Sequence, residues 1–268
     1  MEFTVLMPIY KAEKPHYFTQ ALKSIYSNSF QASEVLVVCD GPLTIELNAV
    51  LQDFSDYETL NILRLDKNYG IATALNHGLK AAKYDLIIRC DSDDINHDDR
   101  FKKLCYAFAK GIDVVGSSIQ EIDSKGRVIN RKFMPENHKD ILARMRYRNP
   151  INHMSVAYNR KTALAFGGYT QVAFKEDYAL WVNLMVEGYK FYNIPECLVS
   201  ARVDDDFHRR RKNIAAIFSE FSLYRFMVKV NFIDVFTAIL FCSFRIIALL
   251  LPVPFLRGFY QFFLRHRG

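Results

Sequence analysis

The sequence predicts an α/β fold, in which helices flank a mainly parallel sheet, with a helical appendage at the C-terminus. Two observations predict it. Short β-branched runs alternate with amphipathic stretches through the first half, and beyond about residue 212 the chain turns into long apolar helical stretches. Half of the 268 residues are apolar, which is enough for a sizeable core. We therefore expect an α/β domain over residues 1–212 and a helical region over residues 213–268.

The first elements follow from apolar spacing. Phe18, Leu22, Ile25 and Tyr26 recur at helical intervals, and residues 71–82 are helix-prone. We expect strands at residues 5–9, 34–39, 60–65, 85–90 and 112–116. A turn at residues 124–126 is expected between strands 119–122 and 127–133. Later, we expect a strand near Val156, a break at Gly167-Gly168 and a helix over residues 178–187.

Composition narrows the class of protein only partly. A formal net charge of +6 suits a polyanionic partner, but its sign does not choose between nucleic acid, anionic lipid and sugar diphosphates. The five cysteines form no C-x-x-C pair, which indicates buried thiols in a reducing cytosol. Met1 leads straight into the first predicted strand, so we expect no signal peptide.

The acidic run Asp91-Ser92-Asp93-Asp94 directly follows the predicted strand 85–90. It should therefore lie at the carboxyl edge of the sheet, where open α/β sheets bind ligands. Three acids this close repel one another unless a cation or solvent screens them, and Mg²⁺ or Mn²⁺ bridging to phosphates would use them well. The alternative is a solvated acidic turn before the next helix, which begins near Arg100.

Two further segments end at the same edge. Asp40 can accept hydrogen bonds from a base or a ribose, although Asp-Gly is also a common turn. The segment from Asn68 through Gly70 to Gly78 opens a helix whose N-terminus can favour phosphate, or it is simply a tightly packed helix. Neither a dinucleotide fingerprint nor a P-loop is present in the sequence.

Later residues offer a base and a basic cluster. Glu176 and Asp177 begin a helix, where they either cap it or supply a general base that the helix dipole keeps ionised. His153 is expected to be a core histidine. His208 stands beside three arginines, which suits a diphosphate or a solvated charge run.

Read in order, these segments resemble the family 2 glycosyltransferases of GT-A fold, especially the bacterial surface-polysaccharide and O-antigen enzymes. The matching motifs span residues 5–10, 34–41, 68–78, 91–94, 167–169 and 176–181, within a resemblance over roughly residues 3–210. It implies a nucleotide-sugar donor, a divalent cation (Mn²⁺ or Mg²⁺) and inversion at the anomeric carbon.

The resemblance also implies roles for individual residues. Asp93 and Asp91 would bind the metal or its waters, Asp91 would also contact the ribose, and Asp177 would be the catalytic base. The residues implied to hold the nucleoside or close over it are Pro8, Tyr10, Asp40, Asn68, Gly70 and Asn76. The residues implied to close over the diphosphate are His208, also a metal ligand, with Arg209 and Arg210. Many relatives carry a second acid where Cys39 stands, which leaves the base contact to Asp40 alone.

We therefore expect transfer of a hexose, from UDP-hexose, to a polyprenyl-diphosphate-linked sugar in O-antigen, capsule or exopolysaccharide assembly. The expected partners are donor, acceptor and an anionic membrane surface, and no nucleic acid. The alternatives are a non-catalytic, membrane-associated nucleotide-binding protein and a nucleotidyltransferase of similar fold. Against the nucleotidyltransferase, this sequence lacks the Gly-rich basic loop that such an enzyme is expected to carry after its first strand. An aspartyl phosphotransferase would place its acids after the first strand, which here ends in Pro8-Ile9-Tyr10.

The C-terminal region is too interrupted to be a spanning helix. Residues 235–244 and 246–251 are apolar, but Arg245 separates them and Pro252 ends the run, whereas a span needs about 20 apolar residues. An interfacial helix pair on the cytoplasmic face of the inner membrane fits better, with Arg257, Arg265 and Arg267 available for anionic headgroups. The alternative is a helix packed back on the α/β domain.

Overall fold

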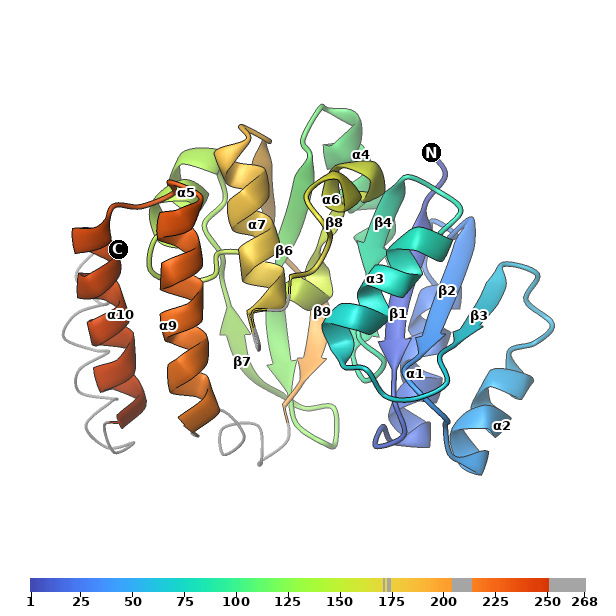
Figure 1. The fold of residues 1–268 in the computed structure, drawn as a ribbon. Coiled ribbons are helices and arrows are strands. Elements are labelled where there is room, and N and C mark those ends of the chain that lie inside the picture. The colour runs from blue at the N-terminus through green and yellow to red at the C-terminus, as the bar shows by residue number, and fades with distance from the viewer. Residues whose placement is uncertain (171, 173–174, 204–213, 251–268) are drawn as a thin grey trace. The chain divides into compact units, whose positions relative to one another are not determined.

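The computed structural model of the chain describes residues 1–170, 172, 175–203 and 214–250 (Figure 1). The chain forms two compact units. The first comprises Met1–Gln171 and Glu176–Asp204, and the second comprises Val172–Lys175 and Asp205–Gly268. Residue 212, the predicted domain boundary, lies outside the described residues, so this division stays a prediction.

The first unit is built on one mixed sheet. Its strands are β1 (Thr4–Ile9), β2 (Glu34–Cys39), β3 (Leu60–Arg64), β4 (Leu86–Arg89), β5 (Ile95–Asn96), β6 (Val114–Ile122), β7 (Val128–Lys132), β8 (Ala157–Asn159) and β9 (Phe191–Arg202). Their order is β3-β2-β1-β4-β8-β6-β9-β5, with β7 on β6. The first four strands in this order are parallel, and so are β6 and β9, whereas β8 runs antiparallel to both β4 and β6.

Helices cover both faces of the parallel strands, as the alternating pattern predicts. They are α1 (Pro15–Tyr26), α2 (Ile45–Asp53), α3 (Ile71–Ala81), α4 (Arg100–Ala109), α5 (His138–Met145), α6 (Arg160–Ala165) and α7 (Glu176–Val186). The spacing-predicted residues Phe18, Leu22 and Ile25 of α1 are buried in the main core. On the other face α3 packs so closely that a Cβ at Gly78 would lie 2.4 Å from Leu6 Cδ1.

Two details differ from the sequence-based expectation. The segments expected as separate strands at 112–116 and 119–122 form the single strand β6, because Ser117 and Ser118 are buried and pair with neighbouring segments. The long strand β9, which pairs with β6 along its length, was not expected, nor was α2.

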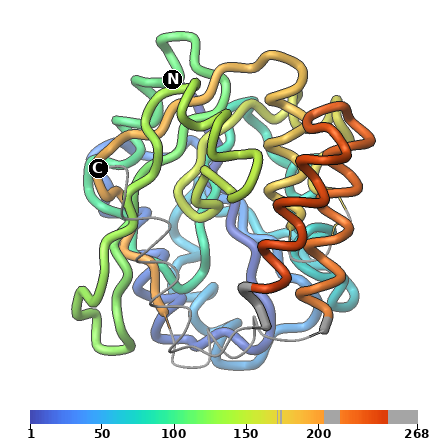
Figure 2. The backbone as a smooth tube through the Cα atoms, turned by 90° about the vertical axis from the view of Figure 1, so that its left-hand side faces the viewer, coloured from blue at the N-terminus to red at the C-terminus, as the bar shows by residue number. Residues whose placement is uncertain are grey.

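The described part of the second unit is helical. It contains α9 (Ile214–Lys229) and α10 (Val235–Leu250), which lie side by side in Figures 1 and 2. The carboxylate of Glu220 on α9 is buried and binds two cations through Oε1, Lys175 Nζ at 3.0 Å and Arg245 Nη2 at 2.8 Å. The charge of Arg245, which interrupts the apolar sequence, is therefore paired with the Glu220 carboxylate of the neighbouring helix. Among the described residues, no helix combines the length and the apolar character needed to cross a bilayer.

Candidate active site

Three carboxylates meet where β4 ends. The pairing of β4 with β1 continues to Arg89 opposite Leu6, and the backbone N–H of Cys90 still donates to the Leu6 carbonyl at 3.0 Å. The chain then leaves the sheet at its carboxyl edge. Asp91, Asp93 and Asp94 each offer one oxygen to a common site, and these oxygens lie within 4.8 Å of one another. The sequence predicted this position; Asp94, however, was not among the predicted ligands.

Among the described residues, protein groups balance the charges of this acidic cluster only in part, through the ion pair of Arg89 with Asp91. Burial, with Asp91 and Glu13 nearby, raises the pKa of Asp93 to about 7. Burial, with Asp91 and Asp93 nearby, raises the pKa of Asp94 well above its usual value. Asp94 Oδ2 is buried and has no hydrogen-bond partner in the described part of the chain. Clustered oxygens, mutual repulsion and an unpartnered buried oxygen fit a hard divalent cation, which prefers oxygen ligands.

Arg202, at the end of β9, contacts the acidic cluster although it is distant from it in the sequence. Its backbone N–H donates to Asp94 Oδ1 at 2.8 Å, and its Nε donates to the Asp93 carbonyl at 3.1 Å. The guanidinium also lies over the Tyr17 ring, 3.9 Å from its centroid. No local sequence signal marks this residue, because its contacts depend on the pairing of β9 in the sheet.

Asp40, which directly follows β2, forms hydrogen bonds with the residues just before the N-terminus of α3. Its Oδ1 accepts from Tyr69 N at 2.7 Å and its Oδ2 accepts from Gly70 N at 3.0 Å. The turn needs Gly41, because φ is +87° there and an added Cβ would lie 2.7 Å from Asn68 N. Asp40 thus orders the predicted nucleoside segment, and its direct contact with a base stays a prediction.

The remaining predicted nucleoside residues lie on or beside this edge. Pro8 is within β1, and Tyr10, 43 % exposed, directly follows that strand. Asn76 on α3 has a visible structural role, since its Oδ1 accepts from Tyr169 N and its Nδ2 donates to Tyr169 O, both at 2.8 Å. The predicted contacts of Pro8, Tyr10 and Asn76 with a donor stay predictions.

Asp177 is the second residue of α7, and Asn149 Nδ2 donates to its Oδ2 at 2.7 Å. The sequence did not single out Asn149. Burial raises the pKa of Tyr169 well above its usual value, with a smaller contribution from nearby Asp177. The Tyr169 hydroxyl bonds Tyr158 OH at 2.7 Å and His153 Nε2 at 3.0 Å. Desolvation and the Arg89 cation lower the pKa of His153 well below its usual value, so the ring is neutral.

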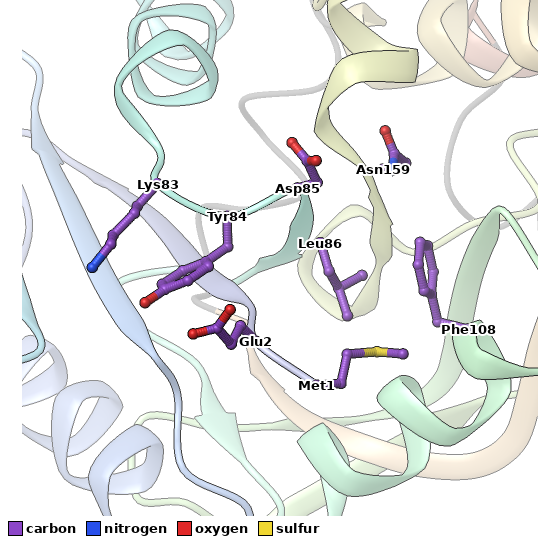
Figure 3. A pocket seen from close by; sticks show the side chains of 8 residues that line it. All are labelled: Met1, Glu2, Lys83, Tyr84, Asp85, Leu86, Phe108 and Asn159. Carbon is purple, nitrogen blue, oxygen red and sulfur yellow. The ribbon is translucent and has the colours of Figure 1, made fainter.

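One other feature, a cavity, does not belong to this site. A cavity of about 350 Å³ lies at the opposite, amino-terminal edge of β1 and β4 (Figure 3). Its lining residues are Met1, Glu2, Lys83, Tyr84, Asp85, Leu86, Phe108 and Asn159. The predicted diphosphate residues His208, Arg209 and Arg210 lie outside the described residues, so their roles stay predictions.

Comparison with known proteins decides the family. Residues 4–166 match the family model of glycosyl transferase family 2. The chain belongs to this family. Over 264 residues it is 35 % identical to an Escherichia coli UDP-Gal:alpha-D-GlcNAc-diphosphoundecaprenol beta-1,3-galactosyltransferase, covering 96 % of this chain and 94 % of that protein. It is 31 % identical over 261 residues to the amylovoran biosynthesis glycosyltransferase AmsE of Erwinia amylovora, covering 97 % and 98 % of the two chains.

Solved structures show the same fold. S. aureus TarS 1–349 in complex with UDP-GlcNAc superposes with a TM-score of 0.70 at 17 % identity, covering 100 % of this chain and 75 % of that one. The mannosyltransferase PcManGT from Pyrobaculum calidifontis, in complex with GDP-Man and Mn²⁺, gives a TM-score of 0.65 at 16 % identity, covering 85 % and 64 % of the two chains. The predicted GT-A fold and the predicted family are thereby confirmed.

Proposed function

We propose that this family 2 glycosyltransferase moves a hexose from a UDP-sugar to a polyprenyl-diphosphate-linked sugar, with inversion, during assembly of a surface polysaccharide. The observation that carries the proposal is the acidic cluster at the end of β4 in a chain of this family. The E. coli relative matches nearly the whole chain, and the UDP-Gal donor and GlcNAc-diphosphoundecaprenol acceptor in its name support the choice of donor and acceptor.

The acidic cluster would serve the departing diphosphate. Asp91, Asp93 and Asp94 would hold the divalent cation, Mn²⁺ or Mg²⁺, which when bound neutralises negative charge on the leaving group. Asp40 fixes the Tyr69-Gly70 turn, so the nucleoside would meet an ordered edge of the sheet. His208, Arg209 and Arg210 would add positive charge beside the diphosphate.

Asp177 would act on the acceptor. At the first turn of α7 the helix dipole favours its ionised form, and Asn149 orients the carboxylate through Oδ2. The carboxylate takes the proton from the acceptor hydroxyl as that oxygen attacks the anomeric carbon and the bond to the diphosphate breaks. A single displacement from the opposite face inverts the configuration, and no covalent intermediate on the enzyme is needed.

The second unit would hold the enzyme at the cytoplasmic face of the inner membrane, beside its lipid-linked acceptor. The exposed face of α10 is apolar and includes Phe236, Ile239, Leu240 and Ile247, while Arg245 is paired with Glu220. A helix with such a face and without free charge on it suits the interfacial layer of a bilayer. The competing possibility is that this face packs on protein instead.

Co-sedimentation with vesicles tests the membrane contact. We expect wild type to bind phosphatidylglycerol vesicles more strongly than phosphatidylcholine vesicles. A variant with serine at Phe236, Ile239 and Leu240 should lose most of that binding, whereas serine at exposed Tyr106 on α4 should not change it. A wild-type protein that stays off anionic vesicles would exclude the membrane role.

Donor binding followed by turnover tests the activity. Nucleotide-sugars are screened for binding in Mn²⁺ and again in excess chelator, and a UDP-hexose should bind in a metal-dependent way. The bound donor is then offered polyprenyl-diphosphate sugars, and UDP should be released. Binding without release of nucleotide on any lipid-linked acceptor would favour the non-catalytic nucleotide-binding alternative.

A further inference from the structure

Arg89 is a buried cation directly beside the acidic cluster. It is the last residue of β4 and is 2 % exposed. Its Nη2 lies 2.5 Å from Asp91 Oδ1. Its backbone cannot shift easily, because Arg89 N donates to the Val156 carbonyl at 2.9 Å and Arg89 O accepts from Arg100 Nη2 at 2.7 Å. The cation is therefore fixed at the strand end before any ligand arrives.

Among the residues that the structure describes, Arg89 forms an ion pair with no anion other than Asp91. Its Nε and Nη1 are buried and lack hydrogen-bond partners within the described part of the chain. The neighbouring Tyr158, Tyr169 and His153, whose pKa values Arg89 influences, are neutral. Burying an unpaired cation costs free energy. For Arg89, nearly all of this cost is offset by the carboxylates that follow it in the sequence.

We propose that Arg89 is a positioning residue that orients Asp91 within the acidic cluster for a divalent cation. The ion pair holds Asp91 at one carboxylate oxygen, which restricts rotation of that side chain and so prearranges the ligand oxygens. This inference rests on the proposed metal-dependent function.

The test is Mn²⁺ binding in the absence of donor, measured from the electron paramagnetic resonance signal of the free ion at one fixed pH. Outer residues that orient metal ligands typically contribute about 10–100-fold to affinity. We expect Arg89→Met to weaken Mn²⁺ binding by that factor, and Arg89→Lys, which keeps the charge, to weaken it less. Unchanged or tighter binding by Arg89→Met would overturn the proposal.

A double-mutant cycle shows whether Arg89 acts through Asp91. In an Asp91→Asn background, adding Arg89→Met should change Mn²⁺ affinity little, since the carboxylate to be oriented is already gone. The same fold-loss in both backgrounds would contradict the assignment. If Arg89→Met alone does not fold, Arg89→Lys takes its place in the cycle with the same expected non-additivity.

Arg160→Met provides the matched control. Arg160 forms an ion pair with Asp85 at 3.1 Å, at the opposite end of β4, and its removal should leave Mn²⁺ affinity unchanged. The metal-only measurement also separates the two proposals. Mn²⁺ binding that follows the predicted pattern in a protein without transferase activity would refute the proposed function alone, whereas absence of Mn²⁺ binding by wild type would refute the role of Arg89.

Discussion

A substitution at Asp93 should raise the stability of the metal-free protein and lower its activity. Its pKa in the folded chain, about 7, lies above the ordinary value of 3.8. Without a cation the folded state therefore binds this proton more tightly than the unfolded state, and the free energy of unfolding falls as pH rises between those values. Asp93→Asn removes the ionisation. In chelator at pH 8 we expect the variant to be more stable than wild type by about 1–3 kcal/mol.

Urea unfolding at pH 4 and pH 8 measures this difference, which should nearly vanish at pH 4. The same substitution should abolish turnover and weaken metal-dependent donor binding. Exposed Asp98→Asn is the control and should change neither property. An Asp93→Asn enzyme with full activity, or one that is less stable at pH 8, would contradict the assignment.

Asp177 should affect the rate rather than donor binding. Loss of a general base typically lowers the rate by about 10²–10⁴-fold, so Asp177→Asn should reduce kcat by that factor with little change in donor affinity. The neighbouring Glu176→Gln is the matched control and should have a smaller effect. Near-normal turnover by Asp177→Asn in a steady-state assay would remove Asp177 from the mechanism.

The segment between α6 and α7 depends on a close backbone approach. At Gly168, φ is +69° and an added Cβ would lie 2.1 Å from Asn76 Oδ1, whereas at Gly167, φ is +82° but the space is open. Both alanine substitutions strain the backbone, and Gly168→Ala also breaks the contact of Asn76 with Tyr169. We expect Gly167→Ala to cost about 1 kcal/mol and Gly168→Ala at least about 2 kcal/mol in urea unfolding. Equal losses would show that the Asn76 contact contributes little.

Helices and strands were predictable where the local pattern of apolar residues matches the burial of those residues in the fold. Strands β1 and β2 are buried at every position and read as continuous apolar runs, and α1 shows its helical spacing. Strand β9 contains Asn193 and Pro195, and residues 195–196 fall between the paired positions Ile194 and Cys197, so only pairing with β6 defines it. The strand near Val156 was predicted, but its antiparallel pairing with β4 and β6 was not, for the same reason: such pairings are not local.

At the scale of the whole molecule, the site is predictable only where its residues are close in sequence. The acidic cluster comes from one short run and was predicted as a metal site. Arg202 binds the acidic cluster and Asn149 binds Asp177, each from a distant segment, so no spacing reveals them. Arg89 did carry a signal, a lone charge inside the apolar run before the acids, but only the structure shows that this charge is buried and paired with Asp91.

The stereochemistry of transfer tests the central claim most directly. In the proposed mechanism the acidic cluster serves the leaving diphosphate and Asp177 serves the acceptor, so transfer requires one displacement from the opposite face. With an α-linked UDP-hexose and a polyprenyl-diphosphate sugar in Mn²⁺, proton NMR of the purified product should show a β linkage. An α-linked product would mean retention and would contradict both the role of Asp177 and the single-displacement mechanism.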